Sequence, residues 1–225
     1  MVLFPVATVV AWRLVVRRKV SIWVGTASVS TAAGIATLVA GRADLSPKLS
    51  VPWALLAGAG TGAAFYVATA VFVVMARRVP FFDAHVVELY AEQHQVSLPA
   101  ALVVAALLSA PGEELFWRGL FQGHLAEGQG RVAAAVLTWA VWVVVYLASQ
   151  NLAIIAGAVV GGAVWGALAL WTHGVLAPIV SHSVWTALMV AEPPGGRQPR
   201  SSALPGDQSE PTETPPPATG TTGSP

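Results

Sequence analysis

Two adjacent glutamates and an arginine stand at the end of a long apolar run in this sequence. They are Glu113, Glu114 and Arg118. Glu114 and Arg118 are four residues apart, so on a helix they share a face and can form an ion pair. Glu113 points about a quarter of a turn away and has no partner at that spacing. Ionisable residues at membrane depth are costly and mark functional sites by default, so we interpret Glu113 as a general base.

The alternative for the two glutamates is a structural role at a helix end. Pro111 suits the first turn of a helix, so the sequence predicts that Glu113 and Glu114 follow a helix start, after a break at Pro111 and Gly112. Carboxylates at that place would complement the helix dipole. One carboxylate is enough for this purpose, and two adjacent ones favour a functional role.

A histidine in the last apolar run is the second candidate for chemistry. Thr186 follows His182 by one helical turn, so both side chains can address one site. A lone buried histidine is usually structural, but a histidine and a glutamate together can activate a water, directly or through a bound metal. The other histidines are interpreted as solvated or structural; they are His85, His94, His124 and His173.

The composition indicates an integral membrane protein. Of 225 residues, 55% are hydrophobic and 10% are charged, with a mean hydropathy of +0.66. Soluble domains carry about 25% charged residues. The net charge of +1 gives no sign of a nucleic-acid partner. Because the sequence contains no cysteine, disulfides, thiolate metal sites and a cysteine nucleophile are excluded.

Apolar runs of about 20 residues predict membrane-spanning helices. The expected fold is an all-α integral membrane protein, a bundle of six to seven transmembrane helices with one interfacial helix. The first run, residues 2–16, is short and contains Arg13, so it is a weak span or an interfacial helix. The other runs are residues 22–40, 51–75, 99–110 continuing to about 125, 132–148, 152–171 and 175–191.

Two basic loops set the predicted orientation. They lie at residues 17–19 and 77–78. The positive-inside bias places both loops on the cytoplasmic side, which the two spans between them allow. Residues 79–98 are less apolar and show a helical pattern of polar and apolar positions, which favours a helix along the membrane surface.

The composition changes after residue 192. Residues 1–192 are predicted to form the transmembrane domain, with a motif-bearing core at about residues 98–189. Residues 193–225 are rich in proline, threonine, serine and glycine. Such a segment cannot bury enough apolar surface to offset the entropy of ordering it, so it is predicted to be a disordered tail.

The residues described above resemble the CPBP family of intramembrane proteases, which process CAAX proteins and bacteriocins. The family's first motif, Glu-Glu-x-x-x-Arg, is matched by Glu113, Glu114 and Arg118. Its last motif, a histidine followed four residues later by Asn or Asp, is matched in part by His182 and Thr186. The stretches 161–166 and 176–178 are also similar to the family's, and the resemblance covers about residues 98–189.

Two positions depart from the family pattern. The second motif, Phe-x-x-x-His, is best matched by the run from Trp142 to Tyr146, so tyrosine stands where the family has histidine. Gln150 is the other candidate for that position. In the last motif, Thr186 replaces Asn or Asp.

The resemblance also implies roles for these residues. The first glutamate and the last histidine of the family, here Glu113 and His182, would activate the attacking water. The two departing positions would stabilise the oxyanion, and the hydroxyls of Tyr146 and Thr186 can still donate to it. The family residues have also been read as metal ligands. No cofactor is predicted, and a divalent metal such as zinc is disfavoured because tyrosine and threonine are poor zinc ligands.

The sequence therefore predicts an intramembrane endopeptidase of the glutamate type, with CAAX-like or leader-peptide processing as its reaction. Its partners would be a membrane-associated protein or peptide substrate and the lipid bilayer, and the family match suggests a bacterial plasma membrane. The predicted catalytic set is Glu113, Glu114, Arg118, Tyr146, His182 and Thr186.

Two alternatives remain open from the sequence. The first is a catalytically degenerate family member that acts as a membrane binding or scaffold protein, and the loss of the second-motif histidine motivates it. The second is a small transporter with a buried relay of glutamate, arginine and histidine. The absence of inverted repeats from the sequence counts against the transporter.

Overall fold

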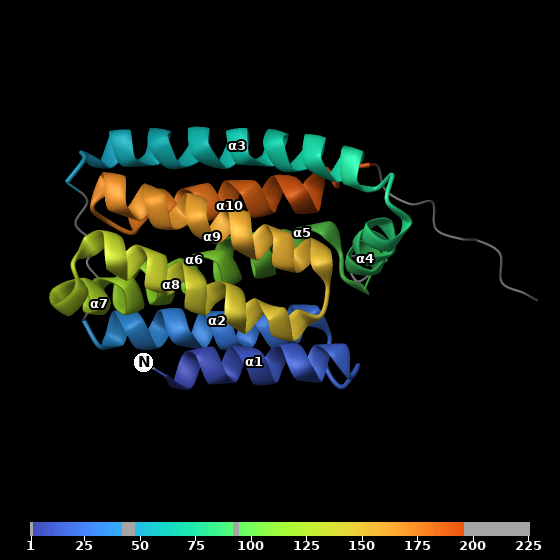
Figure 1. Cartoon of the computed structure of the whole chain (residues 1–225), viewed down its shortest axis with the longest axis horizontal. Coiled ribbons are helices and arrows are strands. Elements are labelled where there is room, and N and C mark those ends of the chain that lie inside the picture. Colours follow the sequence, from blue (N-terminus) through green and yellow to red (C-terminus); the bar gives the residue numbers. More distant parts are fainter. Residues whose placement is uncertain (1, 42–47, 92–94, 196–225) are drawn as a thin grey trace, which may run out of the picture.

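Long helices run side by side along one direction in this chain (Figure 1). A computed structural model describes residues 2–41, 48–91 and 95–195, and these residues contain no strand. The predicted all-α membrane fold is confirmed. The helices are α1 (Leu3–Val16), α2 (Ile22–Val39), α3 (Val51–Ala76), α4 (Pro80–Ala91), the continuous helix Leu98–Gln129 that contains α5 (Leu98–Leu102), α6 (Ala110–Glu114) and α7 (Gln122–Gln129), then α8 (Arg131–Tyr146), α9 (Leu152–Thr172) and α10 (Leu176–Ala191).

Five of the described helices are long and apolar enough to cross a membrane. They are α2, α3, the helix Leu98–Gln129, α8 with the short turn that follows it, and α9. Two shorter apolar helices, α1 and α10, pack with them. With 14 residues, α1 extends about 21 Å, less than the roughly 30 Å of a hydrocarbon core. The predicted total of six to seven spans depends on these two short helices and stays a prediction.

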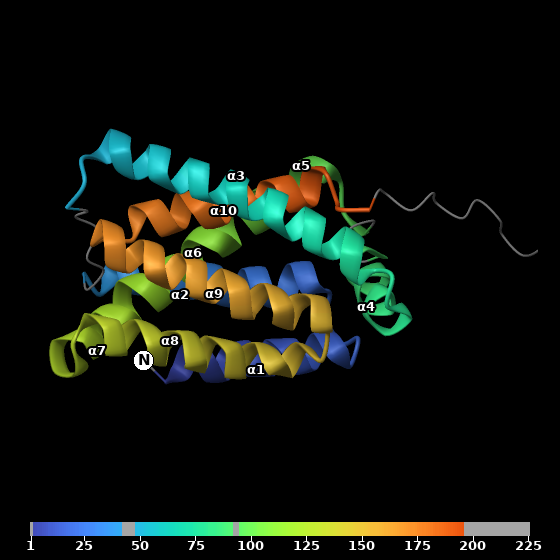
Figure 2. The ribbon, with the colours of Figure 1, turned by 45° about the horizontal axis from the view of Figure 1, so that its top comes forward.

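The helices are arranged so that α3 and α10 lie together at one edge of the bundle, with α1 at the opposite edge (Figure 2). Between these edges lie α6 and α9 (Figure 2). The helix α6, which carries the two glutamates, packs against α10, which carries His182 and Thr186. The predicted tail lies outside the described residues beyond residue 195.

The helix that carries the two glutamates is continuous from Leu98 to Gln129. The predicted break at Pro111 and Gly112 is therefore wrong, and the glutamates lie in mid-helix rather than at a helix N-terminus. Wider π-helical turns flank α6, at Val103–Ser109 and Leu115–Phe121. The wider turn before Pro111 makes room for its ring, which would clash with the preceding turn of a regular α-helix.

Both basic loops lie at one end of the bundle, where α4 also lies, and we call it the basic end (Figure 1). Arg18 in the first loop forms an ion pair with Glu88 of α4 at 3.7 Å. Arg77 in the second loop pairs with Asp83 of the same helix. Figure 1 shows α4 turned across the direction of the long helices. This position agrees with the prediction of a helix along the membrane surface.

The connections between the later helices are short and have identifiable causes. Gly130 alone separates α7 from α8, and its φ of +77° is a conformation that glycine adopts without strain. Asn151 caps α9, since its Oδ1 accepts a hydrogen bond from the Ala153 amide at 3.0 Å. These tight connections hold α7, α8 and α9 in antiparallel contact.

Glycines allow the closest helix approaches. A Cβ atom at Gly62 of α3 would lie 2.5 Å from the Ser181 carbonyl oxygen of α10. A Cβ atom at Gly34 of α2 would lie 2.7 Å from Gly112, next to the first glutamate. Small residues of this kind let helix backbones pack closely in lipid, where van der Waals contact drives association.

The first prediction concerns this packing. Gly62→Ala should destabilise the protein by about 1–3 kcal/mol, because the added methyl group has no room against a backbone carbonyl. Gly60→Ala, two residues away on the same helix, is the matched control because its Cβ would meet no atom within 4 Å. Thermal unfolding of both variants in detergent measures the difference. Equal melting temperatures for the two variants would contradict the close approach of α3 and α10.

Candidate active site

The two adjacent glutamates face different neighbours in the bundle. Successive residues of a helix point about 100° apart, so one helix can direct two carboxylates towards two separate partners. Glu113 contacts α2 and α8, whereas Glu114 contacts α10 and the next turn of its own helix. Both side chains are buried, and Glu114 is completely inaccessible at 0% exposure.

Glu114 is the centre of a buried charge network. Its Oε1 accepts a hydrogen bond from Arg118 Nη1 at 3.1 Å, so the predicted ion pair forms. The same oxygen lies 2.9 Å from His182 Nδ1. Because the carboxylate only accepts, Nδ1 carries the proton in this pairing and Nε2 is the nitrogen left for another partner. The sequence paired His182 with Glu113 for the activation of a water, and the direct hydrogen bond of His182 is to Glu114.

Arg118 is held from several sides. Its Nη2 donates to the Gly162 carbonyl oxygen of α9 at 3.1 Å. The guanidinium also lies over the Trp142 ring, 4.6 Å from its centroid. A cation over an aromatic face gains about 0.5–2 kcal/mol, more when the pair is desolvated. Any Cβ on Gly162 would approach Trp142 to 2.9 Å, so glycine at this position permits the stacking.

The imidazole of His182 is fixed by an aromatic ring as well as by Glu114. The Trp165 ring stacks on it with a centroid distance of 3.6 Å and an interplanar angle of 18°. Trp142 and Trp165 both pack in the core, and each of them also lies against one charged or titratable member of the network.

Glu113 has two partners that come from other helices. Ser30 Oγ of α2 donates to Glu113 Oε1 at 2.9 Å. The Tyr146 side chain of α8 lies close enough to the Glu113 carboxylate to interact with it. Sequence reasoning missed Ser30, which is one serine among many small residues of an apolar run. The close packing of Gly112 against the backbone of α2 at Ser30 and Gly34 brings this serine to Glu113.

Four of the predicted residues line one cavity of about 660 Å³: Glu113, Tyr146, His182 and Thr186. Most of its wall is apolar, with Phe65 of α3 and Ile154 of α9 as examples. Side chains of α4, among them Phe82, Val86 and Tyr90, line the part nearest the basic end. The cavity thus extends from the buried carboxylate to the basic end of the bundle.

The other sequence candidates lie elsewhere. Gln150 is exposed, with a left-handed φ of +55° at the end of a short turn, and does not line the cavity. Tyr146, the other candidate for the second-motif position, does line the cavity. His85, His124 and His173 do not line the cavity either, and His94 lies outside the described residues.

Chemically, the site combines a carboxylate, an imidazole and two hydroxyls around one apolar space. This set can remove a proton from a water and donate hydrogen bonds to a developing oxyanion. In the part of the chain that the structure describes, no group of three or more histidine, aspartate or glutamate side chains is arranged to hold a metal ion.

Residues 95–188 match the sequence model of a protein family described as type II CAAX prenyl endopeptidase Rce1-like. The match begins just before the helix Leu98–Gln129 and ends within α10, so it contains all six predicted catalytic residues. No curated protein and no solved structure gives a significant match. Over residues 95–188, this integral membrane protein is thus similar to the Rce1-like type II CAAX prenyl endopeptidases, and the match agrees with the resemblance of its motifs to the CPBP family.

Proposed function

We propose that this chain is an intramembrane endopeptidase that hydrolyses a peptide bond in a membrane-associated protein or peptide, of the CAAX or leader-peptide kind. The observation that carries the proposal is that Glu113, His182, Tyr146 and Thr186 line one cavity. The family match supports the reaction class. The mostly apolar wall of the cavity suits a substrate segment that arrives from lipid or carries an apolar modification.

In the proposed mechanism, Glu113 is the general base and His182 holds the water. Water donates one hydrogen bond to His182 Nε2, the nitrogen that Glu114 does not engage, and one to the Glu113 carboxylate. Glu113 takes the proton as the water oxygen bonds to the scissile carbonyl carbon. The C–N bond then breaks, and the proton passes from Glu113 to the leaving amine. Glu114 and Arg118 act as positioning residues, because they fix the imidazole and do not line the cavity themselves.

Tyr146 and Thr186 are the proposed donors to the oxyanion. In the structure the Tyr146 side chain lies close to the Glu113 carboxylate. Once Glu113 has taken the proton of the water, it is no longer an anion, and the new oxyanion becomes the stronger acceptor for the Tyr146 proton. Substitution of the family histidine by tyrosine is therefore compatible with catalysis through a hydroxyl donor.

A non-catalytic binding or scaffold protein is the rival function, and one observation favours it. By motif spacing, Tyr146 stands where the family has histidine, and it lines the cavity together with Glu113 and His182. A protein of this kind would bind membrane-associated tails in the same cavity without cutting them. A comparison of membrane-protein termini between wild-type protein and Glu113→Gln distinguishes the two functions.

The second prediction is that Glu113→Gln abolishes cleavage and leaves the protein folded. Glutamine still accepts the hydrogen bond from Ser30 but cannot take a proton, so the rate should fall by about 10²–10⁴. The measurement compares the termini of membrane proteins in cells that carry wild-type or variant protein at equal levels. Termini that disappear only with the variant identify the substrates. Identical terminal profiles would support the scaffold function.

The Glu114→Gln variant distinguishes an effect on folding stability from an effect on the catalytic step. Glu114→Gln should lower the melting temperature as well as the activity, because it leaves the buried Arg118 without its anion. Breaking a buried pair in this way costs about 3–5 kcal/mol. Similar melting temperatures for Glu113→Gln and Glu114→Gln would show that the two glutamates do not have the different roles proposed for them.

The third prediction concerns the hydroxyl donors. Tyr146→Phe and Thr186→Val should each lower kcat by about 10²–10³ with little change in KM, since an oxyanion donor acts mainly in the transition state. Tyr90→Phe removes a hydroxyl from the same cavity on α4 and should leave kcat unchanged. Steady-state cleavage of a substrate identified by the terminal profiles provides the measurement. An equal loss in all three variants would point to cavity shape and not to oxyanion stabilisation.

The fourth prediction is that metal chelators leave the activity intact. Tyrosine and threonine at positions 146 and 186 are poor zinc ligands, so the proposed chemistry uses Glu113 and His182 directly. The purified protein should keep its cleavage rate after treatment with EDTA or 1,10-phenanthroline. A loss of activity that added zinc restores would instead establish a metal-dependent hydrolase.

A further inference from the structure

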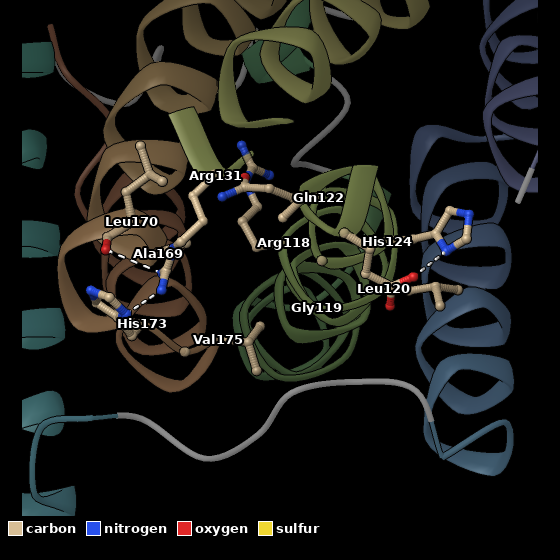
Figure 3. A pocket seen from close by; sticks show the side chains of 14 residues that line it. Arg118, Gly119, Leu120, Gln122, His124, Arg131, Ala169, Leu170, His173 and Val175 are labelled. Carbon is tan, nitrogen blue, oxygen red and sulfur yellow. Dashed lines mark hydrogen bonds and ion pairs between the residues drawn. The ribbon is translucent and has the colours of Figure 1, made fainter. Parts of the chain in front are cut away.

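A second pocket, of about 420 Å³, lies at the end of the bundle opposite α4. It is formed where the helix Leu98–Gln129 turns into α8 and where α9 ends. Figure 3 looks into this pocket and shows Arg118 and Gln122 beside Arg131. We call it the polar vestibule. None of its lining residues except Arg118 belongs to the proposed site.

Polar side chains surround the vestibule. Arg131 contacts His173 and donates to the Leu170 carbonyl oxygen at 3.4 Å (Figure 3). On the other side, His124 lies 3.4 Å from Glu127. Desolvation, followed by the positive charge of Arg131, lowers the pKa of His173, so this ring is neutral at pH 7 and can accept from Arg131. This lining differs from the mostly apolar wall of the cavity of about 660 Å³ that Glu113 and His182 line, which we call the substrate cavity.

The charge network connects the lining of the vestibule to the lining of the substrate cavity. Arg118 lines the vestibule. Its partner Glu114 accepts from His182, and His182 lines the substrate cavity. A continuous chain of hydrogen bonds, Arg118 to Glu114 to His182, therefore connects one pocket to the other.

Buried polar atoms along this chain have no hydrogen-bond partner among the described residues. They are Gln122 Oε1, Arg118 Nε, Glu114 Oε2, Trp142 Nε1 and Trp165 Nε1. Gln122 is 7% exposed and lines the vestibule. Buried polar groups are nearly always satisfied, and ordered water satisfies those that protein groups do not reach. Such atoms are found from Gln122 in the vestibule to Trp165, whose ring stacks on His182, and water molecules beside them would satisfy them.

The proposed reaction needs such a route. Hydrolysis consumes a water at Glu113 and His182, and a substrate segment that fills the apolar cavity excludes water from that side. We propose that the polar vestibule is the site through which the hydrolytic water reaches the active site, along Gln122, Arg118 and Glu114. This inference rests on the proposed function for its purpose, but its physical content is a water path that can be measured without substrate.

The experiment uses radiolytic hydroxyl-radical labelling of the full chain in lipid nanodiscs. Radicals formed from bound water oxidise adjacent tryptophans, and Trp142 and Trp165 lie against the charge network and also line the substrate cavity, so they report water that arrives from either side. Both side chains are 2% exposed. We expect oxidation of both tryptophans in the wild-type protein in spite of this burial. Absence of labelling at both positions would overturn the water path.

Variants then identify the side from which the water comes. Gly123→Phe places a ring in the vestibule, because Gly123 lines it and its Cβ meets no atom within 4 Å. Gly128→Phe is the matched control on the same helix, equally free of contacts and outside the vestibule lining. Gln122→Leu removes the polar lining at similar volume. Labelling of Trp142 and Trp165 should fall severalfold in Gly123→Phe and Gln122→Leu and stay at the wild-type level in Gly128→Phe.

A bulky side chain in the substrate cavity tests whether the water enters from that cavity and not from the vestibule. Gly157 lines the substrate cavity, and its Cβ would lie 3.9 Å from the nearest side-chain atom, so Gly157→Phe narrows that cavity. This variant should keep the labelling of Trp142 and Trp165. The inference is overturned if Gly157→Phe abolishes the labelling while Gly123→Phe preserves it, since water would then come through the cavity.

The kinetics of substrate cleavage give an independent test of the water path. Gly123→Phe should lower kcat and leave KM unchanged, whereas Gly157→Phe should raise KM because it occupies substrate space. If the wild-type protein cleaves nothing but its labelling depends on Gly123, the water path stands and the proposed function falls. If the wild-type protein cleaves and Gly123→Phe changes neither labelling nor kcat, the proposed function stands and the water path falls.

Discussion

A fully buried carboxylate, Glu114, is the constraint on which the rest of the bundle depends. A charge removed from water costs several kcal/mol unless a counter-charge and hydrogen bonds replace its hydration. Glu114 obtains both from Arg118 and His182, which lie on its own helix and on α10. Arg118 in turn binds the Gly162 carbonyl oxygen of α9. One charge therefore fixes the relative positions of three helices, and any loosening of their packing would leave a buried ion unpaired.

Close packing makes this network geometrically possible. Gly162 allows Trp142 to lie against the guanidinium, and Gly112 lies against the backbone of α2, which brings Ser30 to the other glutamate. In lipid there is little hydrophobic gain from helix association, so van der Waals contact and interhelical hydrogen bonds have to supply it. The same contacts that hold the bundle together also orient Glu113. Stability and site geometry thus have common causes in this protein.

The division of the interior into two unlike pockets follows from the same network. The apolar cavity suits a substrate that arrives from the membrane, but an apolar space is a poor source of water for hydrolysis. The polar vestibule lies on the far side of Arg118, within reach of the aqueous surface. The buried ion pair of Glu114 and Arg118 lies between the two pockets. The proposed hydrolysis in lipid would bring together reactants that prefer different solvents, and this arrangement would keep their routes apart.

The sequence by itself determined the membrane class, most helix bounds and the pairing of Glu114 with Arg118, because apolar periodicity and the i,i+4 rule are local. It also placed Tyr146 and Thr186 on separate helices by motif spacing, and both line the cavity. Tertiary structure alone decided that the glutamate helix continues through its proline, that Ser30 contacts Glu113, and that His182 binds the second glutamate rather than the first. Those outcomes depend on which helix faces meet and how closely, and no local pattern in one chain segment encodes that distance.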